Sequence, residues 1–175
     1  MTYSEDHLKR ILGDVEYLID EAEALIYVID GVPVAEKAAG VESMMEMMAL
    51  IDHAQISYYR PLIERIYSVP KVDERPADFR ETFKQQNESS ADSEDEKEQV
   101  QELLQSIAKN RRGLLTFVNK LPLTELRQQG NINGVTRSIA DLLEEMVNFE
   151  RQQLKQIAER ILTLDSNMNS GRGQS

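Results

Sequence analysis

His53 is the residue of this sequence best placed to do chemistry. It lies near the middle of the stretch 41–67, whose apolar residues have the spacing of a long helix. An imidazole acts as a general base or as a metal ligand near neutral pH. The other histidine, His7, lies close to the start of the chain. We interpret His7 as a surface residue in the first turn of a helix.

Gln153 is a second polar residue in an apolar pattern. It lies seven residues after Met146 and four before Ile157, so the apolar face of a helix should continue through it. A buried amide needs hydrogen-bond partners or a cavity beside it. Phe149 precedes Gln153 by one helical turn and shares its face. A bundle that brings the two helices together would have His53, Phe149 and Gln153 lining one pocket.

Four amphipathic stretches predict the helices that position these residues. In each, apolar residues recur three or four positions apart. Four such helices without a strand signal predict an all-α fold, a four-helix bundle. We expect a single domain over residues 1–165 and a disordered tail over 166–175. The expected helices cover about 4–29, 41–67, 100–121 and 136–161.

Prolines and glycines predict where these helices bend or end. Pro61 has no N–H to donate to the Ser57 carbonyl, so we expect a kink or a broken turn there. Pro122 ends the third helix, and Thr136 is the expected cap of the fourth. The glycine-containing segment 123–135 between them is interpreted as a loop.

The connection between helices two and three is long and polar. Phe79 and Phe83 indicate a short helix or a covering loop within it. The run 87–98 is strongly acidic and is either a cation or partner site or a solvated loop that leads into a helix. Ser93 and Glu96 have the spacing of a capping box, which favours the loop.

Composition excludes several classes of function. The net charge is −11 and the pI about 4.7, so we expect no nucleic-acid partner and no anionic membrane surface. Lys109, Arg111 and Arg112 are the nearest thing to a basic patch, and we interpret them as a solvated helix face. The absence of cysteine excludes disulfides and thiolate chemistry. Without a signal peptide or an apolar span, the expected location is cytoplasmic.

Two segments resemble the DinB/YfiT-like superfamily of four-helix bundles. They are VESMMEMMALIDHAQISYY, residues 41–59, and TRSIADLLEEMVNFERQQLKQI, residues 136–157. The resemblance extends over about residues 4–164. It implies an up-down-down-up topology with a long crossover between helices two and three. It also implies a divalent metal, commonly zinc or nickel, held by one histidine of helix two and two of helix four.

Carried over to this sequence, the resemblance matches His53 to the ligand of helix two. Phe149 and Gln153 fall at the two ligand positions of helix four. Imidazole is a strong ligand for zinc or nickel, whereas a phenyl ring supplies no donor and an amide oxygen is a weak one. Glu46 and Glu150 are nearby carboxylates, but Glu150 is one residue off the matching position and is expected to point elsewhere. We therefore expect a degenerate metal site and no cofactor; the alternative cofactor is a divalent metal such as zinc or nickel.

Three functions remain open from the sequence. The first, which we favour, is a non-catalytic binding or structural module that has lost its metal. The second is an enzyme, a metal-dependent or thiol-dependent transferase or hydrolase in which His53 acts, if need be as a general base without metal. The third is a carrier of a small-molecule ligand in the cavity left by the metal. We assign no catalytic residue.

The expected assembly is a homodimer, since twofold dimers are the commonest oligomers. A cluster of methionines on the second helix bears on this expectation. Methionines at helical spacing form a core or a dimer face more often than an adaptable binding surface. The cluster consists of Met44, Met45, Met47 and Met48.

Overall fold

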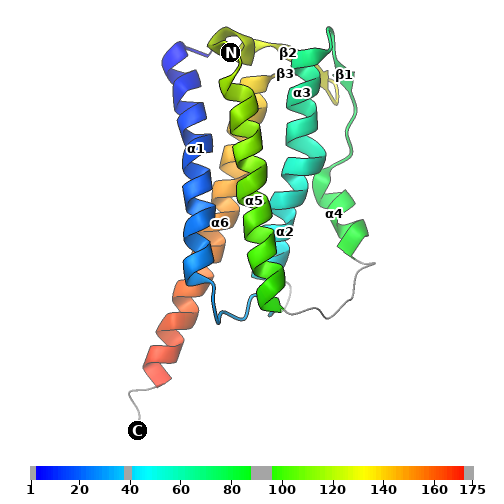
Figure 1. The fold of residues 1–175 in the computed structure, drawn as a ribbon. Helices are drawn as coiled ribbons and strands as arrows, with labels where there is room; N and C mark the ends of the chain where they lie inside the picture. Colours follow the sequence, from blue (N-terminus) through cyan, green and yellow to red (C-terminus); the bar gives the residue numbers. More distant parts are fainter. Residues whose placement is uncertain (1–2, 38–40, 88–95, 172–175) are drawn as a thin grey trace.

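The computed structural model describes residues 3–37, 41–87 and 96–171 (Figure 1). Most of these residues are helical, in agreement with the predicted fold class. The elements are α1 (Glu5–Val28), α2 (Met44–Ala54), a π-helical turn η1 (Gln55–Tyr59), α3 (Arg60–Ser68), β1 (Asp73–Glu74), α4 (Phe79–Asn87), α5 (Glu96–Asn119), a 3₁₀ turn η2 (Leu123–Arg127), β2 (Gln129–Ile132), β3 (Val135–Ser138) and α6 (Ile139–Gly171).

Four long helical rods form the bundle: α1, the continuous rod α2–η1–α3, α5 and α6. Both α1 and α2 pack against α5 and α6. Figure 1 shows α1 and α6 running in one direction and the α2–α3 rod and α5 in the other. This is the predicted up-down-down-up order. Because α3 and α5 are consecutive rods with the same direction, the chain must return along the bundle between them.

The returning connection passes through β1 and α4 before it reaches α5 (Figure 1). Phe79 and Phe83 are both buried, one turn apart on α4. They hold α4 against the bundle, where it packs on α2. Of the two alternatives expected around these phenylalanines, a short helix or a covering loop, the structure has the helix, and it covers the side of α2 that carries His53.

The bundle interior is built from the apolar faces predicted for the four rods. One cluster of buried side chains joins all of them. The methionines of α2 belong to it: Met44, Met47 and Met48 are buried, and Met45 packs against the cluster from its edge. Of the alternatives open for these methionines, a core, a dimer face or an adaptable binding surface, the structure has the core.

The interruption expected at Pro61 is present as one turn of π-helix directly before it. The N–H of Arg60 donates to the carbonyl of Gln55, five residues back, in place of the usual four. Pro61 then occupies the first turn of α3, where its missing N–H is tolerated. Gln55, the first residue of this turn, is buried.

A small sheet closes one end of the bundle, and the prediction of a structureless loop over 123–135 is wrong there. β2 and β3 form an antiparallel hairpin, and β1 adds to β2 in parallel. The turn residues Asn133 and Gly134 both have positive φ, 52° and 81°. That conformation matches the twist of a two-residue hairpin, and Asn-Gly is its strongest sequence signal.

The start of α6 also differs from the prediction. Thr136 lies within β3 and pairs with Asn131, so it does not cap the helix. The cap is Ser138, whose hydroxyl accepts from the N–H of Asp141 at 3.0 Å. The Asp141 carboxylate in turn accepts from the Ser138 N–H at 2.7 Å. The two residues satisfy each other's backbone donors at the helix start.

The far end of α6 continues past the predicted domain boundary. The helix runs to Gly171, so the disorder expected from residue 166 is wrong for 166–171. In Figure 1 this part of α6 extends beyond the ends of the other rods. Most of the acidic run 87–98, with the capping box expected at Ser93, lies outside the described residues, as do 172–175.

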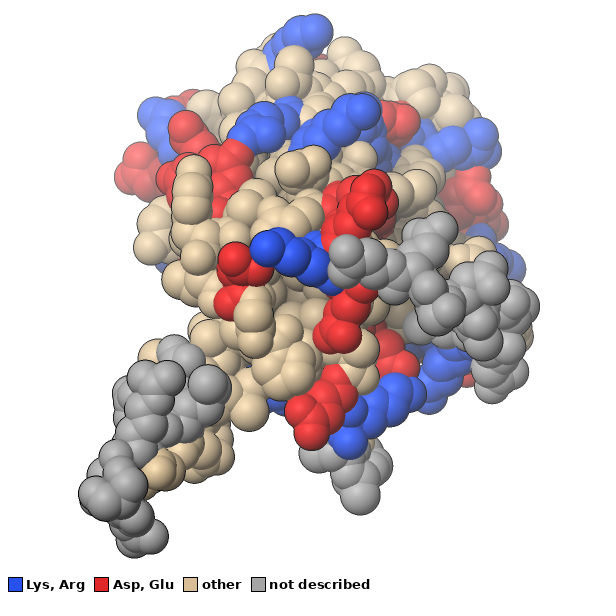
Figure 2. Space-filling model, turned by 60° about the horizontal axis from the view of Figure 1, so that its bottom comes forward, with Lys and Arg blue, Asp and Glu red and all other residues tan. Residues whose placement is uncertain are grey.

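The described surface carries both signs of charge. Figure 2 shows acidic and basic side chains interspersed over the end of the bundle that holds the α1–α2 connection. Within the described residues, no helix is both long enough and apolar enough to cross a bilayer.

Candidate functional site

His53 lies in the last turn of α2 and is half-buried. The start of that helix is set by Ser43, which forms a capping box with Glu46. The His53 Nε2 lies 2.8 Å from the Thr82 hydroxyl of α4. The Thr82 hydroxyl donates its own hydrogen to the Phe79 carbonyl at 3.1 Å. A hydroxyl has one hydrogen, so the tautomer that satisfies both contacts is the one in which the Nε2–H of His53 donates and Thr82 accepts.

In this tautomer, Nδ1 is the ring nitrogen of His53 that does not carry a hydrogen. In a neutral imidazole only one ring nitrogen carries a hydrogen, so Nδ1 holds the lone pair. Burial lowers the pKa of His53, and the nearby Asp52 carboxylate opposes that shift. The ring also lies against Phe83, with 5.7 Å between centroids. His53 is therefore a neutral hydrogen-bond donor under α4.

Phe149 on α6 belongs to an aromatic cluster and not to a polar site. Its ring meets Phe79 edge to face, with centroids 5.1 Å apart. The guanidinium carbon of Arg80 lies 5.2 Å from the Phe149 centroid and 4.9 Å from that of Phe79. Aromatic and cation–π contacts of this kind stabilise the packing of α4 on α6.

Gln153 is half-buried on α6, one turn after Phe149. Its Oε1 is buried and has no hydrogen-bond partner among the described residues. His53 and Phe149 are each held by α4, through Thr82 and Phe79. No direct contact of Gln153 with either is recorded in the described structure. That the three share one pocket stays a prediction.

The donors at these positions do not fit a zinc or nickel ion. Such sites use three or four strong donors, mainly imidazole, thiolate or carboxylate. Here the set is one imidazole whose Nε2–H is donated to Thr82, one phenyl ring and one amide. Among the described residues, no group of three His, Cys, Asp or Glu side chains is arranged to hold a metal.

A buried ion pair in the bundle is the polar feature that sequence reasoning missed. Arg111 of α5 and Glu150 of α6 are both fully buried, and Arg111 Nη2 lies 2.6 Å from Glu150 Oε2. Gln55 Nε2 donates to Glu150 Oε1 at 2.6 Å, and Arg111 Nη1 donates to the Leu18 carbonyl of α1. Burial raises the pKa of Glu150, while Arg111 and Gln55 oppose that rise.

This ion pair corrects two expectations. Arg111 is not part of a solvated face, although its neighbours Lys109 and Arg112 are exposed. Glu150 does not point away from the interior; the buried face of α6 passes through it and leaves Gln153 at its edge. The spacing contained the signal: Arg111 lies four residues after Ile107 and three before Leu114, and Glu150 lies four after Met146 and four before Leu154.

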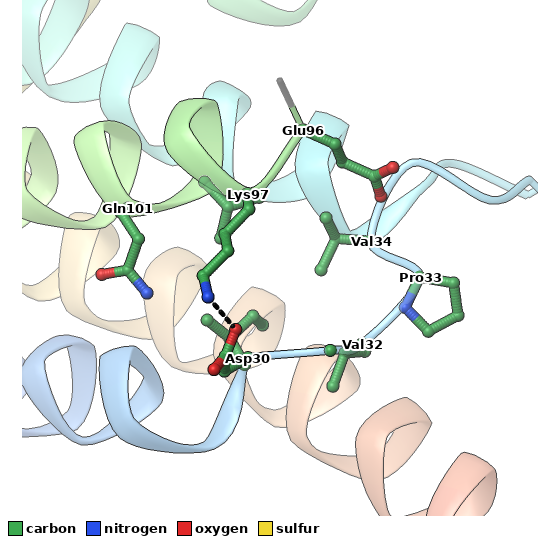
Figure 3. Close-up of a pocket in the computed structure, with 10 residues that line it drawn as sticks. Asp30, Val32, Pro33, Val34, Glu96, Lys97 and Gln101 are labelled. Atoms are coloured by element: carbon green, nitrogen blue, oxygen red, sulfur yellow. Dashed lines mark ion pairs between the residues drawn. The ribbon is translucent and has the colours of Figure 1, made fainter.

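One hollow of the surface lies far from these residues, between the end of α1 and the start of α5. It has a volume of about 390 Å³ (Figure 3). Its walls include Val32 and Val34, and an ion pair crosses it, with Lys97 Nζ 2.8 Å from Asp30 Oδ1. Glu96 also lines it and accepts from the Ala35 backbone N–H at 2.8 Å, so the charged groups of this hollow are bonded within the protein.

Comparison with known proteins identifies the fold. No family model matches the chain, and no curated protein matches its sequence. A solved structure that does match is YfiT from Bacillus subtilis, described as a probable metal-dependent hydrolase with an unusual four-helix bundle topology. The two structures superpose with a TM-score of 0.72 over 90% of this chain and 87% of YfiT.

The chain adopts a YfiT-like fold. The resemblance drawn from residues 41–59 and 136–157 is thus confirmed at the level of the fold. Sequence identity with YfiT is 10%, so the similarity concerns the fold alone. In this chain, the up-down-down-up order requires a crossover, and the crossover lays α4 over His53 and Phe149.

Proposed function

We propose that this chain is a non-catalytic binding module built on the YfiT-like fold, with its metal-ligand positions replaced. The observation that carries the proposal is the state of His53. Its Nε2–H is donated to Thr82, and α4 covers it. The position matched to the first helix-four ligand is Phe149, which packs on Phe79. These contacts support a packing role for His53 and Phe149, at positions that the family resemblance matches to metal ligands.

Metal content tests the proposal. The protein is purified without chelators and without a histidine tag, and zinc and nickel are measured by mass spectrometry. We expect far less than one ion per chain. The double variant Phe149→His/Gln153→His places two imidazoles one turn apart on α6, in addition to His53 on α2. We expect this variant to bind zinc. A gain of zinc would mean that the backbone at these three positions still has the geometry of a metal site. The side chains of Phe149 and Gln153 would then be the reason that the unmodified protein does not bind metal.

The two histidines provide a matched pair of controls. One transition-metal ion per chain in the unmodified protein, lost in His53→Ala and retained in His7→Ala, would overturn the proposal. His7 is suited to this comparison because it lies in the first turn of α1, where its Nε2 is 2.9 Å from Glu144. Both variants remove one imidazole, and only one of them touches the proposed ancestral site.

An enzyme is the second candidate, and one observation favours it. Burial lowers the pKa of His53, which leaves a neutral imidazole with a lone pair on Nδ1 at neutral pH. YfiT itself is described as a probable metal-dependent hydrolase. Hydrolase or thiol-transfer activity that is lost in His53→Ala would favour this candidate over the binding module. Equal activity in the two proteins would exclude His53 as the base.

A further inference from the structure

We propose that the groove between α4 and α6 binds a small organic anion, a carboxylate or a phosphate monoester, through Arg80. The inference rests on the binding role proposed above and names the ligand class. The groove has a volume of about 640 Å³, within the range of small-molecule sites. The residues on which the inference depends are Arg80, Val135, Asn148, Phe149 and Gln152.

The acidic side chains of the groove are already paired. Asp141 accepts from the Tyr3 hydroxyl at 2.6 Å and from a backbone N–H of the α6 cap. Glu144 lies 2.9 Å from the His7 imidazole. Glu145 accepts from the Tyr59 hydroxyl at 3.1 Å and pairs with the other cation of the groove, Arg137. The negative charges therefore have partners within the protein.

Arg80 is the cation that lacks a carboxylate. Among the described residues, no ion pair of its guanidinium is recorded. The group is exposed, and the rings of Phe79 and Phe149 support it from below at 4.9 and 5.2 Å. Contact with two rings limits the freedom of the guanidinium, and its planar fork binds carboxylate or phosphate through two parallel hydrogen bonds.

Neutral donors and an apolar side chain complete the site. Asn148 and Gln152 are exposed one turn apart on α6, and no side-chain hydrogen bond of either is recorded in the part of the chain that the structure describes. Their amide groups can donate to further oxygens of the anion. Val135 of β3 is 59% exposed at the rim, so a ligand with an apolar part covers it. An organic anion can bond to Arg80 and to these amides through its charged end and cover Val135 with its apolar part.

The hollow in Figure 3 provides a contrast within the same molecule. It also contains a cation, but its Lys97 is paired with Asp30 in the same hollow. In the α4–α6 groove, by contrast, a cation in contact with two rings faces the opening together with two amide side chains. In this proposal, the exposed Arg80 guanidinium is what selects the ligand.

Titration with phenyl phosphate tests the inference. Chemical shifts of the ¹⁵N-labelled protein, with a chelator present, are followed as phenyl phosphate is added at constant ionic strength. We expect a dissociation constant of about 1 mM or tighter, with shifts at the side-chain amides of Asn148 and Gln152. Arg80→Gln should weaken binding at least about tenfold, because the charge-assisted bonds are lost. Benzyl alcohol, which has the ring without the charge, should not bind.

Arg75→Gln is the matched control, since it removes an exposed arginine five residues away that does not line the groove. It should bind as the unmodified protein does. Equal binding in Arg80→Gln, shifts that spread over the surface instead of α4 and α6, or no binding by the unmodified protein would each overturn the inference. Metal content is measured independently, so loss of the proposed function and loss of the anion site are separate outcomes.

Discussion

Arg111 and Glu150 place two opposite charges in the interior of a small bundle. Removing ions from water is unfavourable by several kcal/mol for each, and their mutual attraction offsets this only when both are present. The pair also joins all four rods, because Arg111 of α5 donates to the Leu18 carbonyl of α1, and Gln55 of the α2–α3 rod donates to Glu150 of α6. These contacts make the stability of the bundle depend on the two charges being matched.

Arg111→Met should therefore destabilise the protein by about 3–5 kcal/mol, since it leaves a buried carboxylate without its partner. Arg111→Met/Glu150→Gln should recover most of this loss, because the amide removes the charge and can still bond to Gln55. Urea denaturation measures both. Arg112→Met removes only an exposed pair with Glu23 and should cost about 0–1 kcal/mol. If Arg111→Met and Arg112→Met lower the free energy of unfolding by the same amount, the stability of the bundle does not depend on the buried pair.

At the scale of elements, short segments between the long helices supply contacts to them and fix where they start. The crossover helix α4 supplies Thr82 to His53, and it supplies Phe79 and Arg80 to Phe149. The hairpin β2–β3 connects α5 to α6 and leads directly into the cap of α6. Its turn depends on two residues in the left-handed conformation.

Two glycines should respond to the same substitution with opposite signs. Gly134 has φ of 81° in the hairpin turn, where a Cβ is strained, so Gly134→Ala should destabilise the protein by about 1 kcal/mol. Gly13 is exposed within α1 with no atom within 4 Å of an added Cβ. Gly13→Ala should stabilise it by about 1 kcal/mol, because alanine favours the helix. Urea denaturation midpoints measure both changes in stability. If both substitutions change stability in the same direction, the left-handed conformation assigned to Gly134 is contradicted.

At the scale of the whole molecule, one end of the bundle leaves apolar surface uncovered. The side chains of Tyr27 and Leu162 are 86% and 66% exposed, and Val28 beside Tyr27 is 54% exposed. Tyr27 and Val28 are the last two residues of α1, and Leu162 belongs to α6, which extends past the end of α1 in Figure 1. Exposed apolar side chains on a projecting helix are typical of an interface.

We therefore expect a homodimer formed through this end, as the commonest assembly for such a surface. Light scattering after size-exclusion chromatography should give twice the mass of 20.0 kDa. Leu162→Glu should shift the protein toward the monomer. Ile56→Glu places the same charge at a comparably exposed residue of the π turn and should leave the dimer intact. A monomeric mass for the unmodified protein at all concentrations would exclude the dimer.

The sequence by itself determined the rods and the family of folds. Apolar spacing is local, and water drives the apolar face of each helix inward whatever its neighbours are. The resemblance of two segments was sufficient for the topology. Phe79 and Phe83 indicated a covering segment and left open whether it was a helix or a loop. The kink before Pro61 followed from a missing N–H.

Tertiary structure alone decided which polar groups are buried and what they meet. Gln153 and Glu150 lie near the same face of α6, and only the position of Arg111 on another helix makes Glu150 the interior one. The same holds for His53, whose Nε2 contacts the Thr82 hydroxyl of the crossover helix α4. A hydrogen bond or an ion pair needs a partner from a distant part of the chain, and no local pattern records where that partner will lie.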